Sequence, residues 1–84
     1  MYWVYVLQSE STGRFYCGQT DSLKRRVRQH NDPKHHGTKT TKRFLGPWEL
    51  VWSGPCETRA EAMTLEKRIE KRGIARFLQD EGKR

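Results

Sequence analysis

The chain has 84 residues, which is enough for one domain with a modest core and too few for a second domain. Hydrophobic residues make up only 33% of it, and 17 Lys and Arg against 10 Asp and Glu give a net charge of +7 and a pI near 9.9. This balance favours a polyanionic partner, above all nucleic acid. No apolar run approaches the ~20 residues of a membrane span, so we expect no membrane partner.

The two cysteines, Cys17 and Cys56, have no CxxC partner. Such cysteines are typical of reduced thiols that pack in the core, so we expect a cytoplasmic protein without a disulfide. The apolar opening MYWVYVL is too short for a signal sequence and has no basic residues before it. We therefore interpret it as a strand.

The first elements are a predicted β-hairpin over residues 2 to 19. Residues 2 to 8 carry apolar side chains on both faces, which predicts a central strand. SESTG at 9 to 13 has the composition of a turn, and residues 14 to 19 resume an extended pattern. Tyr5 and Tyr16 can then meet across the two antiparallel strands, and Gly18 admits a close approach by another group.

A basic helix follows, and Asp21 is expected to be its N-cap. Leu23 and Val27 are four residues apart and form its apolar stripe. At about 100° per residue, Arg26 and His30 fall beside that stripe, at the border of the core. The other cations of the helix point away from the core, and they are Lys24, Arg25 and Arg28.

The second half of the chain begins with a basic connection over residues 31 to 47, of the kind that is usually functional or mobile. A third strand is predicted over 48 to 53, with Leu50 and Trp52 on one face. Thr58 as N-cap with Glu61 three residues on predicts a helix over 58 to 72, which Gly73 ends.

A short helix over 74 to 79 and a polar tail complete the chain. The elements predict an α+β fold in the order ββαβαα. It consists of a small three-stranded antiparallel sheet, made by the hairpin and the third strand, flanked by two main helices and a short C-terminal helix. We expect a single domain over residues 1 to 80 and a polar tail over 81 to 84.

Glu66 has an unusual position in the helix over 58 to 72. Ala62, Leu65 and Ile69 form the buried stripe of that helix, and Glu66 lies within the stripe. A carboxylate that faces a core is costly unless it is paired or binds a cation. Glu66 therefore needs a partner, and the candidates are a metal ion, Arg26 and a lysine.

Each of these residues has a more ordinary interpretation when taken alone. Tyrosines in strands are usually packing residues, Arg and His at a helix edge are usually surface residues, and an inward Glu is more often half of an ion pair. The joint pattern is more informative, because the side chains come from two strands and two helices and all point inward or to the core edge. These residues are Tyr5, Tyr16, Arg26, His30 and Glu66.

The same residues carry a family resemblance. Over residues 2 to 78 the sequence resembles the GIY-YIG nuclease superfamily, and most closely its small single-domain bacterial branch. Trp3-Val4-Tyr5 corresponds to the first motif and Tyr16-Cys17-Gly18 to the second. Arg26 corresponds to the family's helix arginine, and His30 stands at a position where members often carry His or Tyr. Glu66 corresponds to the metal-binding glutamate of the family.

The sequence departs from the family pattern at three points. Trp3 stands where the first motif has glycine, and Cys17 replaces an aliphatic residue. Some family nucleases also carry an asparagine beyond the metal glutamate, whereas Asn31 is the only asparagine here.

The resemblance implies metal-dependent hydrolysis of DNA phosphodiester bonds. Glu66 would hold a single Mg²⁺ or Mn²⁺, and Arg26 would donate to the phosphate oxygens. Tyr5 would be the general base, with Tyr16 orienting the water or sharing the proton. His30 would orient the arginine, bind phosphate or relay a proton. A non-specific DNA-binding surface would comprise Lys24, Arg25, Arg28, Lys39, Lys42 and Arg43.

Two alternatives to a nuclease remain open at this point. One is a catalytically weak or inactive nucleic-acid-binding module with the same fold, and the other is an interaction protein whose tyrosines are structural. For the nuclease we expect a monomer with a role in DNA repair or recombination. We also expect a protein partner to supply target specificity, because no DNA-binding domain is appended to the nuclease-like core.

Overall fold

The computed structural model describes residues 1–32 and 47–82, which form three strands and three helices. In chain order the elements are β1 (Tyr2–Ser9), β2 (Phe15–Thr20), α1 (Leu23–Asn31), β3 (Trp48–Cys56), α3 (Arg59–Arg72) and α4 (Ile74–Gly82). This is the predicted α+β fold with the order ββαβαα. Within these residues, no helix combines the length and the apolar character needed to cross a membrane.

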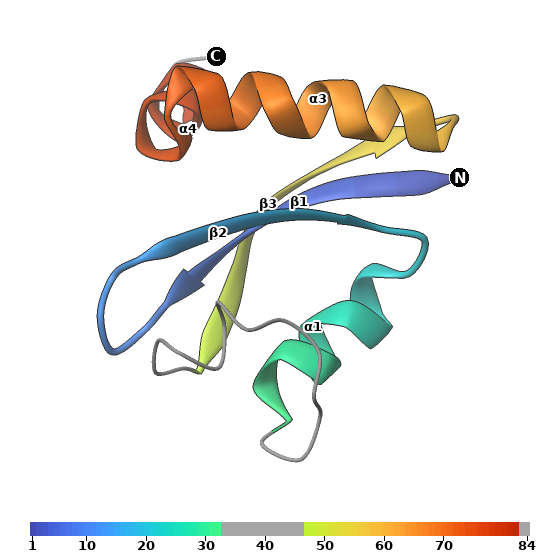
Figure 1. The fold of residues 1–84 in the computed structure, drawn as a ribbon. Coiled ribbons are helices and arrows are strands. Elements are labelled where there is room, and N and C mark those ends of the chain that lie inside the picture. Colours follow the sequence, from blue (N-terminus) through green and yellow to red (C-terminus); the bar gives the residue numbers. More distant parts are fainter. Residues whose placement is uncertain (33–46, 83–84) are drawn as a thin grey trace.

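The sheet is antiparallel, with the strand order β2-β1-β3. The predicted central position of β1 is confirmed, because four consecutive residues of this strand, Val4 to Leu7, are fully buried. Helix α1 covers one face of the sheet, and α3 and α4 cover the other (Figure 1). The domain therefore has three layers, with β2 at one edge of the middle layer.

Each face of the sheet has its own small core. On the α1 face, Tyr5, Leu7 and Trp48 pack against Tyr16, Leu23 and Val27. On the opposite face the buried members are Val4, Val6, Cys17, Cys56, Ala62 and Ile69. The alternation along β1 and β2 thus sends neighbouring residues into different cores.

A β-bulge in β3 corrects the predicted pattern of that strand. Leu50 lies opposite Leu7 and Trp52 lies opposite Val6, with a shift of register between the two pairs. Leu50 and Trp52 therefore face opposite sides of the sheet, and the prediction that they share a face is wrong. One extra residue, Val51, reverses the alternation at this point.

The helix ends agree with the predictions at α3 and differ at α1. Thr58 caps α3 by accepting a hydrogen bond from the Glu61 amide, and Gly73, with φ of 95°, ends that helix as predicted. For α1 the N-cap is Ser22, whose side chain accepts from the backbone amide of Arg25. The predicted cap, Asp21, instead forms an ion pair with the Arg25 side chain at 2.6 Å.

Candidate active site

The two motif tyrosines meet above a glycine. The register of the hairpin places Tyr5 directly opposite Gly18. A Cβ atom at Gly18 would lie 2.6 Å from the Tyr5 hydroxyl oxygen and 3.1 Å from the Tyr16 ring. The absence of a side chain at Gly18 therefore lets the Tyr5 phenol lie across β2 and reach the edge of the sheet.

His30, a residue of α1, lies next to the rings of both tyrosines. Its ring centroid lies 5.9 Å from that of Tyr5 and 5.1 Å from that of Tyr16, and the two tyrosine rings are 6.2 Å apart. With the proton of His30 on Nδ1, the Tyr5 hydroxyl donates a hydrogen bond to Nε2 at 3.0 Å. Tyr5 has no solvent exposure, whereas Tyr16 is half-buried. Solvent thus reaches the cluster at Tyr16.

Burial raises the pKa of Tyr5 well above its usual value. Negative charge at Tyr16 and at Glu66 raises this pKa further, while the nearby guanidinium of Arg26 opposes the rise. The phenol of Tyr5 is therefore protonated at neutral pH, and the proton in its hydrogen bond to His30 belongs to the tyrosine.

Arg26 is a half-buried cation with an unused donor. One of its terminal nitrogens, Nη1, donates to Gln29 Oε1 at 3.2 Å. Its Nε is buried and has no hydrogen-bond partner among the described residues. Buried donors are nearly always satisfied in folded proteins, so this unsatisfied donor is an exceptional feature of the site.

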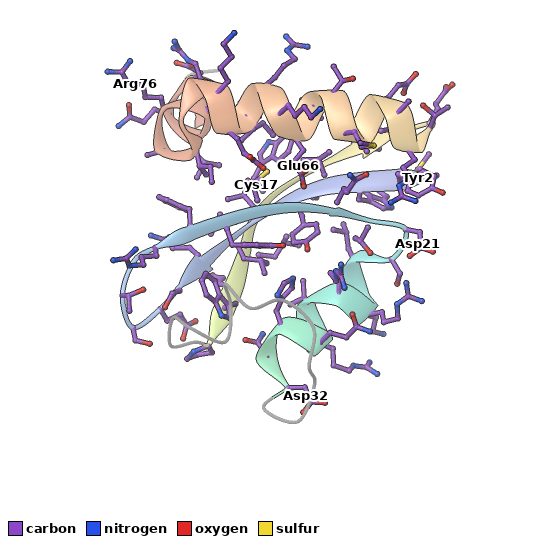
Figure 2. The ribbon with its side chains drawn as sticks, viewed as in Figure 1. Tyr2, Cys17, Asp21, Asp32, Glu66 and Arg76 are labelled. Carbon is purple, nitrogen blue, oxygen red and sulfur yellow. The ribbon has the colours of Figure 1, made fainter. Side chains whose placement is uncertain are left out.

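Glu66 approaches from the other side of the sheet. It points from α3 toward the sheet, with Cys17 beside it (Figure 2). Burial, followed by the negative charge of Glu70, raises the pKa of Glu66. Glu66 forms no ion pair with any described residue. Of its three candidate partners, Arg26 and every described lysine are therefore excluded here.

The tyrosine cluster and Glu66 lie on opposite sides of the edge strand β2. Tyr16 and Gly18 face α1, whereas Cys17 faces α3 and shares a core with Ile69. The tyrosines, His30 and Arg26 thus lie on one side of this strand, and Glu66 lies on the other. The charge of Glu66 still acts on the Tyr5 hydroxyl across the strand.

A comparison with protein families identifies this arrangement. Residues 1–75 match the family model described as the GIY-YIG catalytic domain. The chain belongs to the GIY-YIG family. The predicted family membership is confirmed, and the matched range includes both predicted motif segments, which meet at Tyr5 and Gly18.

The chain is similar to relatives of two kinds. The UPF0213 protein of Limosilactobacillus reuteri is 33% identical, over 96% of this chain and 85% of that protein. The solution NMR structure of the UPF0213 protein BH0048 from Bacillus halodurans has a TM-score of 0.54 and 31% identity, covering 94% of this chain and 81% of that one. These matches confirm the predicted similarity to the small bacterial branch and the α+β fold.

The second kind of relative is much longer. The structure-specific endonuclease subunit SLX1 of Meyerozyma guilliermondii is 44% identical over 60% of this chain. The SLX1 homolog of Giardia intestinalis is 38% identical over 77% of it. The present chain spans only 18% of the length of each of these proteins.

The predicted DNA-binding cations of this GIY-YIG chain divide into two sets. The three on α1 are exposed, and they are Lys24, Arg25 and Arg28. The charge of Arg25 is partly offset by its ion pair with Asp21. The other three, Lys39, Lys42 and Arg43, lie outside the described residues.

Two residues near the site were not predicted from the sequence. Asn31 Nδ2 donates to the Trp48 carbonyl at 3.0 Å, and its Oδ1 accepts from the Trp48 amide at 2.7 Å. Asn31 thus joins the end of α1, next to His30, to the start of β3. Arg59 lines a hollow together with Arg26. Neither position has a local sequence signal, because both contacts join residues that are far apart in the chain.

Proposed function

We propose that this GIY-YIG chain is a metal-dependent endonuclease that hydrolyses DNA phosphodiester bonds at the edge of β2. The observation that carries the proposal is the Arg26 guanidinium, whose buried Nε has no partner in the described structure. It lies beside the Tyr5–His30 pair and across β2 from an inward carboxylate. A phosphodiester supplies the acceptor that Arg26 lacks, and the net charge of +7 favours DNA as its source.

The donor set at Glu66 fits a hard divalent ion, Mg²⁺ or Mn²⁺. Its carboxylate faces inward without a cationic partner in the described part of the chain, and Glu70 adds negative charge. No cluster of three metal-binding side chains occurs among the described residues. A single carboxylate suits Mg²⁺, which keeps its waters and uses substrate oxygens. When bound, the ion would neutralise charge on the scissile phosphate and the leaving oxygen.

Tyr5 and His30 together supply the proton acceptor. Because burial raises the pKa of Tyr5, a free phenolate is unfavourable. Tyr5 therefore takes the proton of the attacking water while its own proton passes to His30 Nε2, 3.0 Å away. Tyr16 is the phenol that solvent reaches, so we assign to it the orientation of the water.

Arg26 stabilises the charge that builds on the phosphate. Its guanidinium already lies near the Tyr5 hydroxyl, where it opposes the rise in pKa, so little reorganisation would accompany the reaction. The exposed cations of α1 add contacts to neighbouring phosphates, which position the DNA without reading its sequence.

The biological setting is part of the same proposal. Both cysteines are free and buried, which suits a reducing compartment, and we propose the cytoplasm. The SLX1 relatives are named as subunits of structure-specific endonucleases. We propose a monomer that acts in DNA repair or recombination and, by analogy with these subunits, works with a protein partner that selects the target.

Cleavage assays with supercoiled, single-stranded and branched DNA in Mg²⁺ or Mn²⁺ test the proposal. Arg26→Ala and Glu66→Ala should each lower the cleavage rate by about 10²-fold or more. The matched control is Arg68→Ala, an exposed cation of α3 that should cut at the wild-type rate. Binding without cutting by every protein, the wild type included, would instead support the non-catalytic module. Cutting that survives Glu66→Ala would refute the metal site.

A further inference from the structure

A second feature of the molecule is a hollow of about 400 Å³ at the end of the sheet where β2 leads into α1. Tyr2 and Asp21 lie together at this end (Figure 2). Gln19 of β2 also lines the hollow, as do Arg26 of α1 and Arg59 of α3. The hollow therefore joins the two faces of the sheet around the edge of β2. Arg26 belongs both to it and to the candidate active site.

Two of the residues that line this hollow carry a buried polar atom without a partner among the described residues. Gln19 Oε1 is an acceptor and Arg26 Nε is a donor, and neither forms a hydrogen bond within the described residues. The proposed nuclease uses Arg26 Nε for the scissile phosphate, so Gln19 Oε1 is the atom that a ligand of this hollow would satisfy, with a donor. A nucleotide next to the scissile phosphate offers one, because its base edge carries N–H groups.

The charge in the hollow also suits a nucleotide. Arg25 is engaged by Asp21, whereas Arg59 forms no ion pair with any described residue. Arg59 and Glu66 are seven residues apart, so they lie on the same side of α3 with a separation of roughly 10 Å along its axis. In the proposed nuclease, a phosphate bound at Arg59 would therefore belong to a nucleotide near the scissile bond.

We propose that this hollow is a subsite for the nucleotide next to the scissile phosphate, with Arg59 on its phosphate and Gln19 on its base. Tyr2 offers the partly buried ring on which that base can stack. The position of the subsite relative to the cut rests on the proposed nuclease function. Its ability to bind single-stranded nucleic acid does not, and this separates the two tests.

The binding test uses fluorescence anisotropy with a labelled single-stranded oligonucleotide in the absence of divalent ions. Arg59→Ala should weaken binding about tenfold, the effect of losing one charge-assisted hydrogen bond. Arg68→Ala removes the same charge from an exposed position of α3 that lines a different hollow, facing α4. It should weaken binding less than about twofold.

Salt dependence separates the phosphate contact from the base contact. Arg59→Ala should lower the slope of log Kd against log salt by about 1, because one phosphate contact is lost. Gln19→Ala should weaken binding without changing that slope, because an amide that contacts a base displaces no counterion. Equal effects of Arg59→Ala and Arg68→Ala, or an unchanged slope for Arg59→Ala, would overturn the subsite.

The kinetic test compares two substrates. For an oligonucleotide, Arg59→Ala should raise KM about tenfold and leave kcat within about twofold of the wild type. Hydrolysis of bis(4-nitrophenyl) phosphate, which has no neighbouring nucleotide, should not change. A loss that is equal on both substrates would place Arg59 in the chemistry and overturn the subsite. A wild-type protein that binds through Arg59 but cuts neither substrate would refute the nuclease proposal alone.

Discussion

Replacement of Gly18 by alanine is the sharpest structural test of the tyrosine cluster. The new Cβ would lie 2.6 Å from the Tyr5 hydroxyl oxygen and 2.8 Å from Cζ of the same ring. Ordinary van der Waals contact begins at 3.4 Å, so the hydroxyl must retreat by about 0.8 Å. Since Tyr5 is fully buried and hydrogen-bonded to His30, the ring cannot move without disturbing that bond.

The expected cost has a structural and a catalytic part. Overpacking of a buried ring costs about 1–3 kcal/mol of the free energy of unfolding. A displacement of about 1 Å in a reacting group can lower a rate by roughly 10²-fold. We therefore expect Gly18→Ala to be folded, moderately less stable and nearly inactive.

Gly54 provides a matched control on the opposite face of the sheet. A Cβ there would lie 2.6 Å from the Trp52 ring, which packs edge-on against Phe77 on the face of the sheet away from the two tyrosines. Gly54→Ala should lose a similar 1–3 kcal/mol in urea denaturation, about the same as Gly18→Ala, while keeping its cleavage rate. If both variants cut DNA at the same rate per folded molecule, the role assigned to Tyr5 is wrong.

Three further experiments test the roles of Glu66, Asn31 and Cys17. The pKa of Glu66 is higher in the folded protein than in the unfolded chain, so the protonated carboxyl favours folding. This stabilisation is fully present at a pH below the unfolded pKa, and it is lost as the pH rises through the folded pKa. Glu66→Gln should accordingly raise the free energy of unfolding at pH 7, by about 0.5 kcal/mol or less because solvent screens this partly exposed group, while abolishing metal-dependent cleavage; a lower melting temperature would contradict this. Asn31→Ala removes both hydrogen bonds to Trp48 and should cost about 1–3 kcal/mol in chemical denaturation, whereas an unchanged midpoint would show that the bridge is dispensable. Burial, aided by Glu66 and Glu70, raises the pKa of Cys17 to about 12, so iodoacetamide at pH 8 should label this thiol only after unfolding. Rapid labelling of Cys17 in the native protein would contradict that assignment.

Local signals predicted most of the fold. The caps of α3 at Thr58 and Gly73 depend on residues within one turn, and the predicted helix agrees with the observed one. The faces of β3 were not predictable, because the bulge near Val51 is set by pairing with β1 and not by the sequence of β3 itself. The cap of α1 was displaced by one residue, since Asp21 and Ser22 are both good N-caps and only Ser22 has the cap geometry.

In the candidate site too, local sequence signals predicted some features, whereas others depend on tertiary contacts. The alternation of the hairpin and the helical period place Tyr5, Tyr16 and His30 on the α1 face, where the structure brings them together. The full burial of Tyr5 depends on the glycine opposite it in the register, which no spacing along the chain reveals. Arg59 joins Arg26 at one hollow because the start of α3 and the end of β2 line it together, which is a tertiary relation.

The central claim is that side chains from opposite faces of the sheet form one metal-dependent site at the edge of β2. Titration with Mn²⁺ followed by NMR tests it most directly, because a paramagnetic ion broadens the signals of nearby nuclei. Substoichiometric Mn²⁺ should first broaden the amide signals of Cys17, Gly18 and Glu66, and Glu66→Gln should abolish the effect. Broadening that begins at Asp80 and Glu81, or that persists in Glu66→Gln, would contradict the account.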